Sequence, residues 1–209
     1  GFLNTLSEGF KNAMPGTMLS ANICANYYSG VDKLKSTAAV TALAHSNTAA
    51  DAAKTEALPY VFTVTQKDFI ANKQLSHEVF GPATLVVLCN NVDEIGDILK
   101  DMEGQLTATV HATGADEKQI QPVIDLMKEK AGRVIFGGFP TGVEVCDAMV
   151  HGGPFPSTTD GRSTSVGTAA ILRFVRPVAY QNFPAHLLPD ALKNNNPLHI
   201  LRKVNGMFT

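Results

Sequence analysis

The regular alternation of apolar runs and helical patterns after Ala83 constrains the fold more than any other feature of the sequence. Three apolar runs, ATLVVLC (83–89), LTATVHA (106–112) and RVIFGG (133–138), are separated by two amphipathic segments. Strands apolar on both faces and joined by helices of this length are typical of a parallel sheet covered by helices. In such sheets, ligand sites lie beyond the carboxyl ends of the strands. This region therefore predicts an α/β fold with a parallel βαβαβ sheet and a site at its carboxyl edge.

Capping residues support the two helices of this unit. Asn91, followed three residues later by Glu94, resembles a capping box, and Asp116 is the predicted N-cap of the second helix. Gly104 and Gly132 stand where the glycines that follow a helix belong.

The residues before Ala83 predict two helices and a strand. Apolar residues at four-residue spacing predict a helix that ends before Pro15-Gly16; they are Phe2, Leu6 and Phe10. Residues 26–53 predict a second helix that runs into an alanine-rich stretch; its apolar face carries Tyr27, Val31, Leu34 and Ala38. The segment YVFTVT (60–65) has the alternation of a half-buried strand.

Composition excludes several classes of function. The 209 residues are 44% hydrophobic and 17% charged, as in ordinary soluble globular proteins. A net charge of −2 without a basic stripe argues against nucleic acid, and no apolar run approaches the ~20 residues of a membrane helix. The cysteines form no C-x-x-C pair and the histidines show no metal-ligand spacing, so we expect no metal and a reducing, cytoplasmic compartment.

The C-terminal third changes in texture. From residue 139 to 167 the chain is dense in Gly, Pro, Ser and Thr, which is typical of a long functional loop. RFVRPVAYQNF (173–183) then predicts a strand, and Pro177 confines that strand to an edge or to pairing with another chain. We therefore expect a main domain over residues 1–172 and an oligomerisation strand with a tail over residues 173–209.

The stretch EVFGP (78–82) resembles the E-x-F-G-P signature of the NAD(P)-dependent aldehyde dehydrogenases. The resemblance extends over residues 140–171 and FVRPVAYQNFP (174–184), which are similar to the branch that oxidises 2-oxoglutarate semialdehyde and is close to bacterial fatty aldehyde dehydrogenases. It covers nearly the whole chain and implies the C-terminal half of the family's catalytic domain, NAD or NADP as cofactor, an aldehyde as substrate and a homo-oligomer.

The resemblance implies roles for four residues. Glu78 would accept hydrogen bonds from the nicotinamide ribose, and Phe80 would pack beside the nicotinamide ring. Arg162 would bind the carboxylate of the semialdehyde, or would brace its loop through Asp160. Phe155 would form a wall of the substrate tunnel, or would simply pack within the loop.

The chain departs from the family pattern in one decisive respect. The nucleophilic cysteine in its G-Q-x-C stretch, the general-base glutamate and the dinucleotide fold are not found, so we expect no catalytic residue here, an inactive isolated chain and a partner in the missing N-terminal part. The three cysteines are interpreted as small buried thiols. Two alternatives stay open: a stand-alone binding or assembly module, and a relative of the acyl-phosphate reductases.

Overall fold

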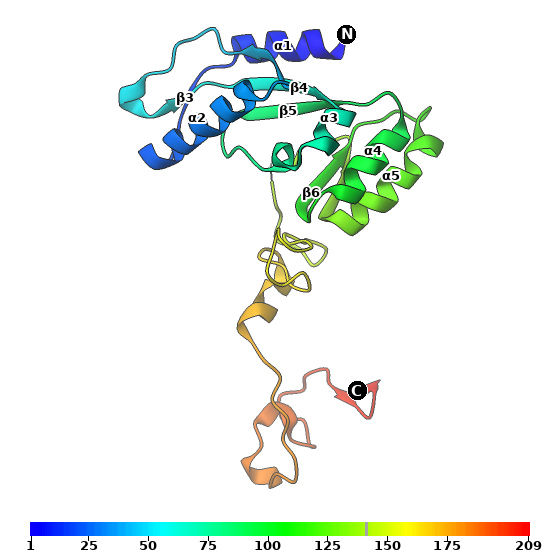
Figure 1. The fold of residues 1–209 in the computed structure, drawn as a ribbon. Helices are drawn as coiled ribbons and strands as arrows, with labels where there is room; N and C mark the ends of the chain where they lie inside the picture. Colours follow the sequence, from blue (N-terminus) through cyan, green and yellow to red (C-terminus); the bar gives the residue numbers. More distant parts are fainter. Residues whose placement is uncertain (141) are drawn as a thin grey trace. The chain divides into compact units, whose positions relative to one another are not determined.

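The computed structural model describes residues 1–140 and 142–209, which divide into two compact units, Gly1–Ala170 and Ile171–Thr209. The predicted long loop includes residue 141, which lies outside the described residues. Helices and strands alternate in the first unit (Figure 1), so the α/β class is confirmed. Among the described residues no helix is long and apolar enough to cross a membrane.

The first unit begins with two helices, and strands that follow them contribute to a three-stranded sheet. Its elements up to the EVFGP stretch are α1 (Phe2–Asn12), β1 (Gly16–Thr17), α2 (Ala21–Ser36), β2 (Thr41–His45), η1 (Ala52–Lys54), β3 (Glu56–Ala57), β4 (Tyr60–Thr65), α3 (Gln66–Ala71) and η2 (Lys73–Ser76). The prediction of α1 is confirmed. The second predicted helix is wrong beyond Ser36, because the alanine-rich stretch supplies β2, which pairs antiparallel with β4. Pairing across the sheet overrides the helix propensity of alanine there.

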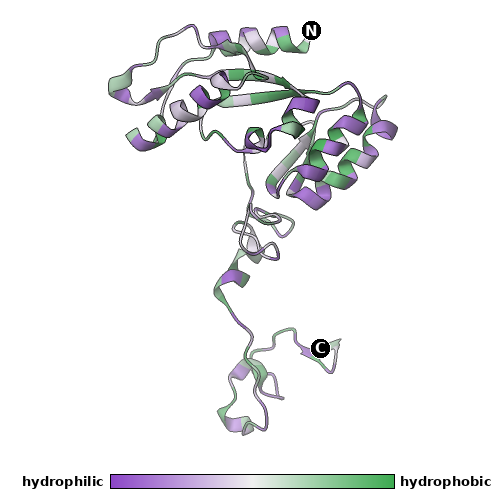
Figure 2. Cartoon of the chain, in the orientation of Figure 1, coloured by the Kyte–Doolittle hydropathy of each residue, from purple (hydrophilic) through white to green (hydrophobic). Residues whose placement is uncertain are grey.

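The strand-helix alternation follows as predicted. Its elements are β5 (Ala83–Leu88), α4 (Val92–Asp101), β6 (Gln105–Val110), α5 (Glu117–Lys130) and β7 (Ala131–Phe136). β5 pairs parallel with β4, from Tyr60 opposite Ala83 to Thr65 opposite Leu88, and β6 pairs parallel with β7. α4 and α5 lie side by side, and both show the alternation of hydrophilic and hydrophobic residues of amphipathic helices (Figure 2).

One ladder through all three predicted strands is not formed in the described residues. β5 belongs to the sheet β2-β4-β5, whereas β6 and β7 form a separate pair. Hydrophobic periodicity identifies strands and crossover helices, but it does not say which strand edges pair. β4, the central strand, is also buried on both faces at its start, since Val61 and Phe62 are both fully buried. The prediction of a half-buried strand is therefore wrong there.

The core of the first unit lies between α2 and the sheet. Tyr27 and Val31 of α2 pack against Ala57, Tyr60 and Phe62, and the rings of Tyr60 and Phe62 are stacked with centroids 5.8 Å apart. Tyr27 and Val31 lie four residues apart, so one face of α2 supplies both. This packing fixes α2 beside the segment that leads to β5.

Asn91 is the N-cap of α4, as predicted, and its side chain accepts a hydrogen bond from the N–H of Glu94 at 3.0 Å. Asp116 occupies the predicted N-cap position of α5, but its side chain makes no capping hydrogen bond. Its carboxylate accepts the N–H and the hydroxyl of Thr113 instead, which lowers the pKa of Asp116. A short polar side chain that bonds a neighbouring turn is no longer available to the helix.

Asn91→Ala is expected to lower the free energy of unfolding by about 1 kcal/mol, because one N–H of the first turn of α4 loses its partner. Urea unfolding of the 209-residue chain measures this. Asn91→Ser keeps an acceptor and should retain most of the stability. Equal losses in the two variants would show that the cap does not act through this hydrogen bond.

The second unit consists of short elements. They are η3 (Thr168–Phe174), in which the unit begins, η4 (Ala185–Leu187), η5 (Asp190–Leu192), β8 (Lys203–Val204) and β9 (Met207–Phe208). β8 and β9 form an antiparallel hairpin. The strand expected over residues 173–183 is not formed, because a strand exists only through pairing and no other described segment pairs with these residues. Whether they pair between subunits, and where the domain boundary lies, stay predictions.

Candidate functional site

Two residues of the segment between η2 and β5, Val79 and Gly81, contact α2 directly. Val79 packs on Gly30 of α2, where an added Cβ would lie 2.9 Å from Val79 Cγ1. Gly81 packs on the ring of Tyr27, where an added Cβ would lie 2.8 Å from Tyr27 Cε2 and closer still to Cδ2. Residues two apart in an extended segment share a side. Val79 and Gly81 therefore face α2.

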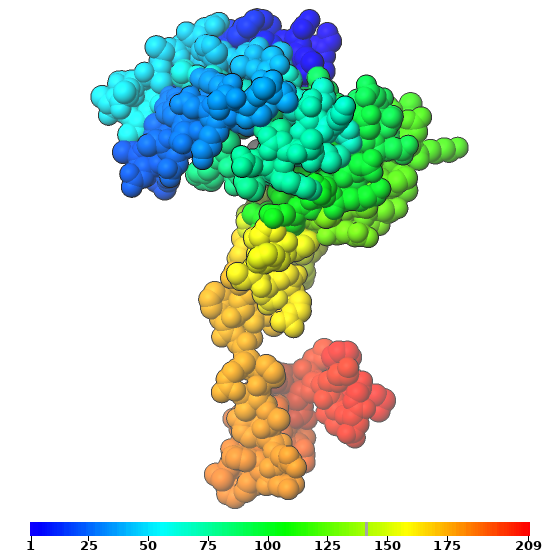
Figure 3. All heavy atoms as spheres, viewed as in Figure 1, coloured from blue at the N-terminus to red at the C-terminus, as the bar shows by residue number. Residues whose placement is uncertain are grey.

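Glu78 and Phe80 are exposed, and the Phe80 side chain remains 66% accessible. Both line a groove of about 770 Å³ between α2 and residues 74–80, together with Asn26, Ser29, Lys33 and Gln74. α2, in blue, and the blue-green segment that precedes β5 lie next to one another at the surface (Figure 3). The structure thus brings the two predicted cofactor-binding residues to one groove, where no described hydrogen bond or ion pair engages the Glu78 carboxylate.

The Gly-Pro pair connects this groove to the sheet. Pro82 O, immediately before β5, accepts the N–H of Tyr60, the first residue of β4, at 2.9 Å. Gly81 has φ +149°, a conformation that is essentially restricted to glycine. The sequence motif thus combines two outward side chains, a glycine seated on an aromatic ring, and the start of a parallel strand.

The groove lies at the amino end of β5, since Glu78 and Phe80 precede that strand. The prediction of a site beyond the carboxyl ends of the strands is wrong for these two residues. The general rule describes loops that follow strands, whereas this segment is held by α2 before the strand begins.

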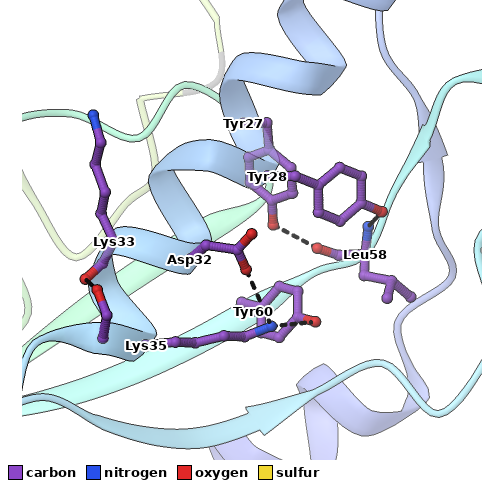
Figure 4. Close-up of polar contacts among 8 residues, drawn as sticks. Tyr27, Tyr28, Asp32, Lys33, Lys35, Leu58 and Tyr60 are labelled. Atoms are coloured by element: carbon purple, nitrogen blue, oxygen red, sulfur yellow. Dashed lines mark hydrogen bonds and ion pairs between the residues drawn. The ribbon is translucent and has the colours of Figure 1, made fainter.

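Tyr27 is the residue that sequence patterns assigned only to the core. Its side chain is 1% exposed and its hydroxyl donates to Leu58 O at 2.5 Å (Figure 4). The adjacent Tyr28 hydroxyl donates to Glu56 O and accepts the N–H of Leu58. Burial raises the pKa of Tyr27 well above its ordinary value, with Tyr28 and Tyr60 adding to the shift, so its hydroxyl stays a donor.

Phe155 and Arg162 lie on the loop that follows β7. Phe155 is 79% exposed, and its carbonyl oxygen accepts the N–H of Gly104 at 3.3 Å. The Arg162 side chain is 94% exposed and its Nε donates to Asp160 Oδ1 at 3.1 Å. Arg162 therefore makes the contact with Asp160 that was expected if it braces its loop. No described hydrogen bond, ion pair or ring contact joins either residue to Glu78 or Phe80.

Gly104 and Gly132 hold this loop rather than ending helices. An added Cβ at Gly104 would collide with the carbonyl oxygens of Pro154 and Phe155, and one at Gly132 would collide with Gly152 O. Neither glycine has a positive φ, and Gly132 lies within β7. The prediction that these glycines end helices is wrong. Glycine is required at both positions because the backbone of residues 152–155 approaches too closely for a side chain.

The cysteines offer no evident nucleophile. Cys24 is buried as expected, whereas Cys89 and Cys146 are half-buried, so the interpretation of these two as buried thiols is wrong. Burial raises the pKa of the Cys89 thiol, and the negative charge of Glu94 raises it further. Both effects disfavour the reactive thiolate. Within the described ranges no group of three or more His, Cys, Asp or Glu residues could hold a metal ion.

Comparison with known proteins gives a consistent result. No family model matches the chain. It is 45% identical over 209 residues to the alpha-ketoglutaric semialdehyde dehydrogenase of Acinetobacter baylyi, covering 100% of this chain and 39% of that protein. It is also 45% identical over 207 residues to alpha-ketoglutaric semialdehyde dehydrogenase 2 of Azospirillum brasilense, covering 98% of this chain and 39% of that protein. The chain thus spans about two fifths of the length of these relatives.

Solved structures resemble the fold. The Mycobacterium tuberculosis Delta-pyrroline-5-carboxylate dehydrogenase bound with NAD matches with a TM-score of 0.60 at 17% identity, over 83% of this chain and 32% of that chain. Succinic semialdehyde dehydrogenase from Streptococcus pyogenes in complex with NADP⁺ matches with a TM-score of 0.54 at 20% identity, over 73% of this chain and 33% of that chain. At these identities the likeness concerns the fold alone.

Proposed function

Because this chain matches aldehyde dehydrogenases over its whole length, we propose that it is the C-terminal part of an NAD(P)-dependent aldehyde dehydrogenase. The observation that carries the proposal is the pairing of Glu78 and Phe80 on one open groove, within a sequence 45% identical to two semialdehyde dehydrogenases. In this reading the chain supplies the coenzyme clamp and part of the substrate wall. The oxidation of an aldehyde to a carboxylic acid belongs to the longer protein.

The residues of the groove fit a nicotinamide coenzyme. A carboxylate with two acceptor oxygens matches the vicinal hydroxyls of a ribose, and an exposed phenyl ring can hold a flat ring against it. NAD or NADP, when bound, accepts a hydride from the substrate carbon. The Glu78 side chain orients the sugar, and Phe80 restricts the position of the ring and excludes water from that side.

The nucleophile and the general base of this chemistry lie outside the 209 residues in our proposal. The raised pKa of Cys89 and the burial of Cys24 leave neither thiol suited to attack an aldehyde. In our proposal the isolated chain is inactive and needs the N-terminal part as its partner. Residues 173–183 join subunits of a homo-oligomer, and the compartment is cytoplasmic.

A chimeric enzyme tests the proposal. This chain replaces the matching 39% of the Acinetobacter baylyi relative, and activity with NAD and NADP is measured on several aldehydes. The intact relative is the control. Oxidation of 2-oxoglutarate semialdehyde by the chimera supports the proposal, whereas a folded chimera that binds no coenzyme would favour a stand-alone assembly module. Gel filtration of the chimera reports whether the subunits associate.

The substrate of the proposed enzyme is a semialdehyde that carries a carboxylate, and Arg162 is the residue that recognises it. The guanidinium is 94% exposed and holds Asp160 through Nε, which leaves its terminal nitrogens for a carboxylate. Phe155, exposed on the same loop, forms part of the apolar wall of the substrate tunnel in this proposal. This assignment rests on the proposed function and extends it to the substrate class.

Arg162→Ala in the chimera is expected to reduce the preference for acidic over neutral aldehydes by roughly 5- to 10-fold in kcat/KM, about 1 kcal/mol or more. Asp160→Asn is the matched comparison, because it loosens the loop contact without removing the guanidinium. If Arg162 only braces its loop, both variants will lower kcat/KM equally for acidic and neutral substrates.

A further inference from the structure

Two residues of α2, Tyr27 and Gly30, form a contact surface, here called the seat, for the segment that precedes β5. Tyr27 and Gly30 lie three residues apart, so they share one face of the helix. Val79 and Gly81 lie two residues apart and meet that face in register: Val79 on Gly30, and Gly81 on the Tyr27 ring. Both contacts depend on a missing side chain, since a Cβ at either glycine would lie 2.9 Å or less from its neighbour.

The seat itself is rigid. Tyr27 is 1% exposed, its hydroxyl donates to Leu58 O at 2.5 Å, and its ring meets that of Tyr28 edge-on with centroids 5.3 Å apart. Figure 4 shows both tyrosines directed from α2 towards Leu58. An aromatic ring fixed at its hydroxyl end and packed along its face has little freedom to move. The backbone of Gly81 rests on this ring.

The alternation of the segment transfers this rigidity to the groove. With Val79 and Gly81 held against α2, the backbone on both sides of Val79 is fixed, and this places Glu78 and Phe80 at the groove that α2 and residues 74–80 enclose. Neither Glu78 nor Phe80 is held by a described hydrogen bond of its own. Their positions therefore depend on the two residues between which they alternate.

We propose that Tyr27 and Gly30 are positioning residues for coenzyme binding, which place Glu78 and Phe80 by seating Val79 and Gly81 on α2. This inference rests on the proposed function and deepens it, because it assigns the precision of the coenzyme clamp to the contacts of Tyr27 and Gly30 with the segment that carries Glu78 and Phe80. Displacing Val79 shifts Glu78 and Phe80 together and weakens the grip on the nicotinamide ribose without removing either group.

Gly30→Ala in the chimeric enzyme tests the seat with one methyl group. The added Cβ presses on Val79 Cγ1, so KM for the coenzyme is expected to rise ~3- to 10-fold while KM for the aldehyde changes little. The double variant Gly30→Ala/Val79→Ala makes room for the methyl group and should restore KM for the coenzyme. A merely structural role would instead lower thermal stability without a change in KM that is specific to the coenzyme, so thermal unfolding of the single and double variants is measured beside the two KM values.

Tyr27→Leu and Tyr28→Phe separate positioning from support of the fold. Both remove a hydroxyl bonded to residues 56–58, but only Tyr27 lies beneath Gly81. Tyr27→Leu should raise KM for the coenzyme, and Tyr28→Phe should lower thermal stability with KM unchanged.

Glu78→Ala serves as the benchmark for these variants. If Glu78→Ala weakens coenzyme binding but Gly30→Ala and Tyr27→Leu do not, the positioning role is overturned and the proposed function stands. If Glu78→Ala has no effect, the groove is not the coenzyme site, and both are overturned.

Discussion

Gly81→Ala is expected to lower the free energy of unfolding of the chain by about 2 to 6 kcal/mol. Two costs add. The residue has φ +149°, where a side chain is strained by ~1–3 kcal/mol. The new methyl group would also overlap the ring of Tyr27, which is fully buried and tied to Leu58 O, so the ring cannot move aside. Overpacking of this kind costs typically ~1–3 kcal/mol.

Gly137→Ala is the control for this measurement. Gly137 has φ +67°, in the left-handed region that L residues enter at lower cost than the region near +149°, and nothing lies within 4 Å of an added Cβ, so its loss sets a lower bound for the backbone cost at Gly81. Urea unfolding of the two variants and the parent chain compares the two losses. A loss at Gly81 no larger than the loss at Gly137 would show that the Tyr27 ring yields, and that the glycine of the motif is required only for its backbone.

The contact of Gly81 with Tyr27 could be predicted from the sequence only in part. The E-x-F-G-P stretch marks Gly81 as special and suggests close approach of the backbone, but the partner is a core tyrosine 54 residues earlier in the chain. Tyr27 shows only an apolar helical pattern, which fits any core residue. No local signal connects the two positions, because their contact arises from the packing of α2 on the sheet.

Secondary structure was predictable where the local pattern agreed with the tertiary structure. Helices α1, α4 and α5 have amphipathic periodicity and form close to their expected bounds. The failures have a common cause in long-range pairing. The alanine-rich stretch becomes β2 because β4 offers an edge, and residues 173–183 form no strand because no described segment offers one.

The candidate site was predictable in its residue types and not in its place. Glu78 and Phe80 were identified by the family motif, and the structure sets both on one groove. The expectation of a carboxyl-edge site failed because periodicity locates strands, whereas the groove is formed by α2 and the segment entering β5. The close contact of Gly104 and Gly132 with the loop that carries Phe155 could not be predicted either. A glycine in the sequence can serve a turn or a close backbone contact equally well.

Glu78→Ala in the chimeric enzyme is expected to weaken coenzyme binding by roughly 10- to 100-fold, because a charge-assisted hydrogen bond contributes ~1.5–3 kcal/mol. The carboxylate is exposed on the groove and engaged by no described partner, so its removal leaves no buried group unpaired. The loss should therefore report the contact with the coenzyme alone. Fluorescence titration with NADH and NADPH measures it, and the absence of tryptophan from these 209 residues limits the background from this part of the chimera.

Glu78→Gln and Glu129→Ala define what the loss means. Glutamine keeps one acceptor oxygen without the charge, so Glu78→Gln should lie between the parent and Glu78→Ala in affinity. Glu129 is an equally exposed acid on α5, outside the groove, and its removal changes net charge by the same amount. If Glu129→Ala weakens binding as much as Glu78→Ala, the effect is one of overall charge, and Glu78 does not touch the ribose. A loss confined to Glu78 assigns the hydrogen bonds to that carboxylate, because only its position distinguishes it from the control.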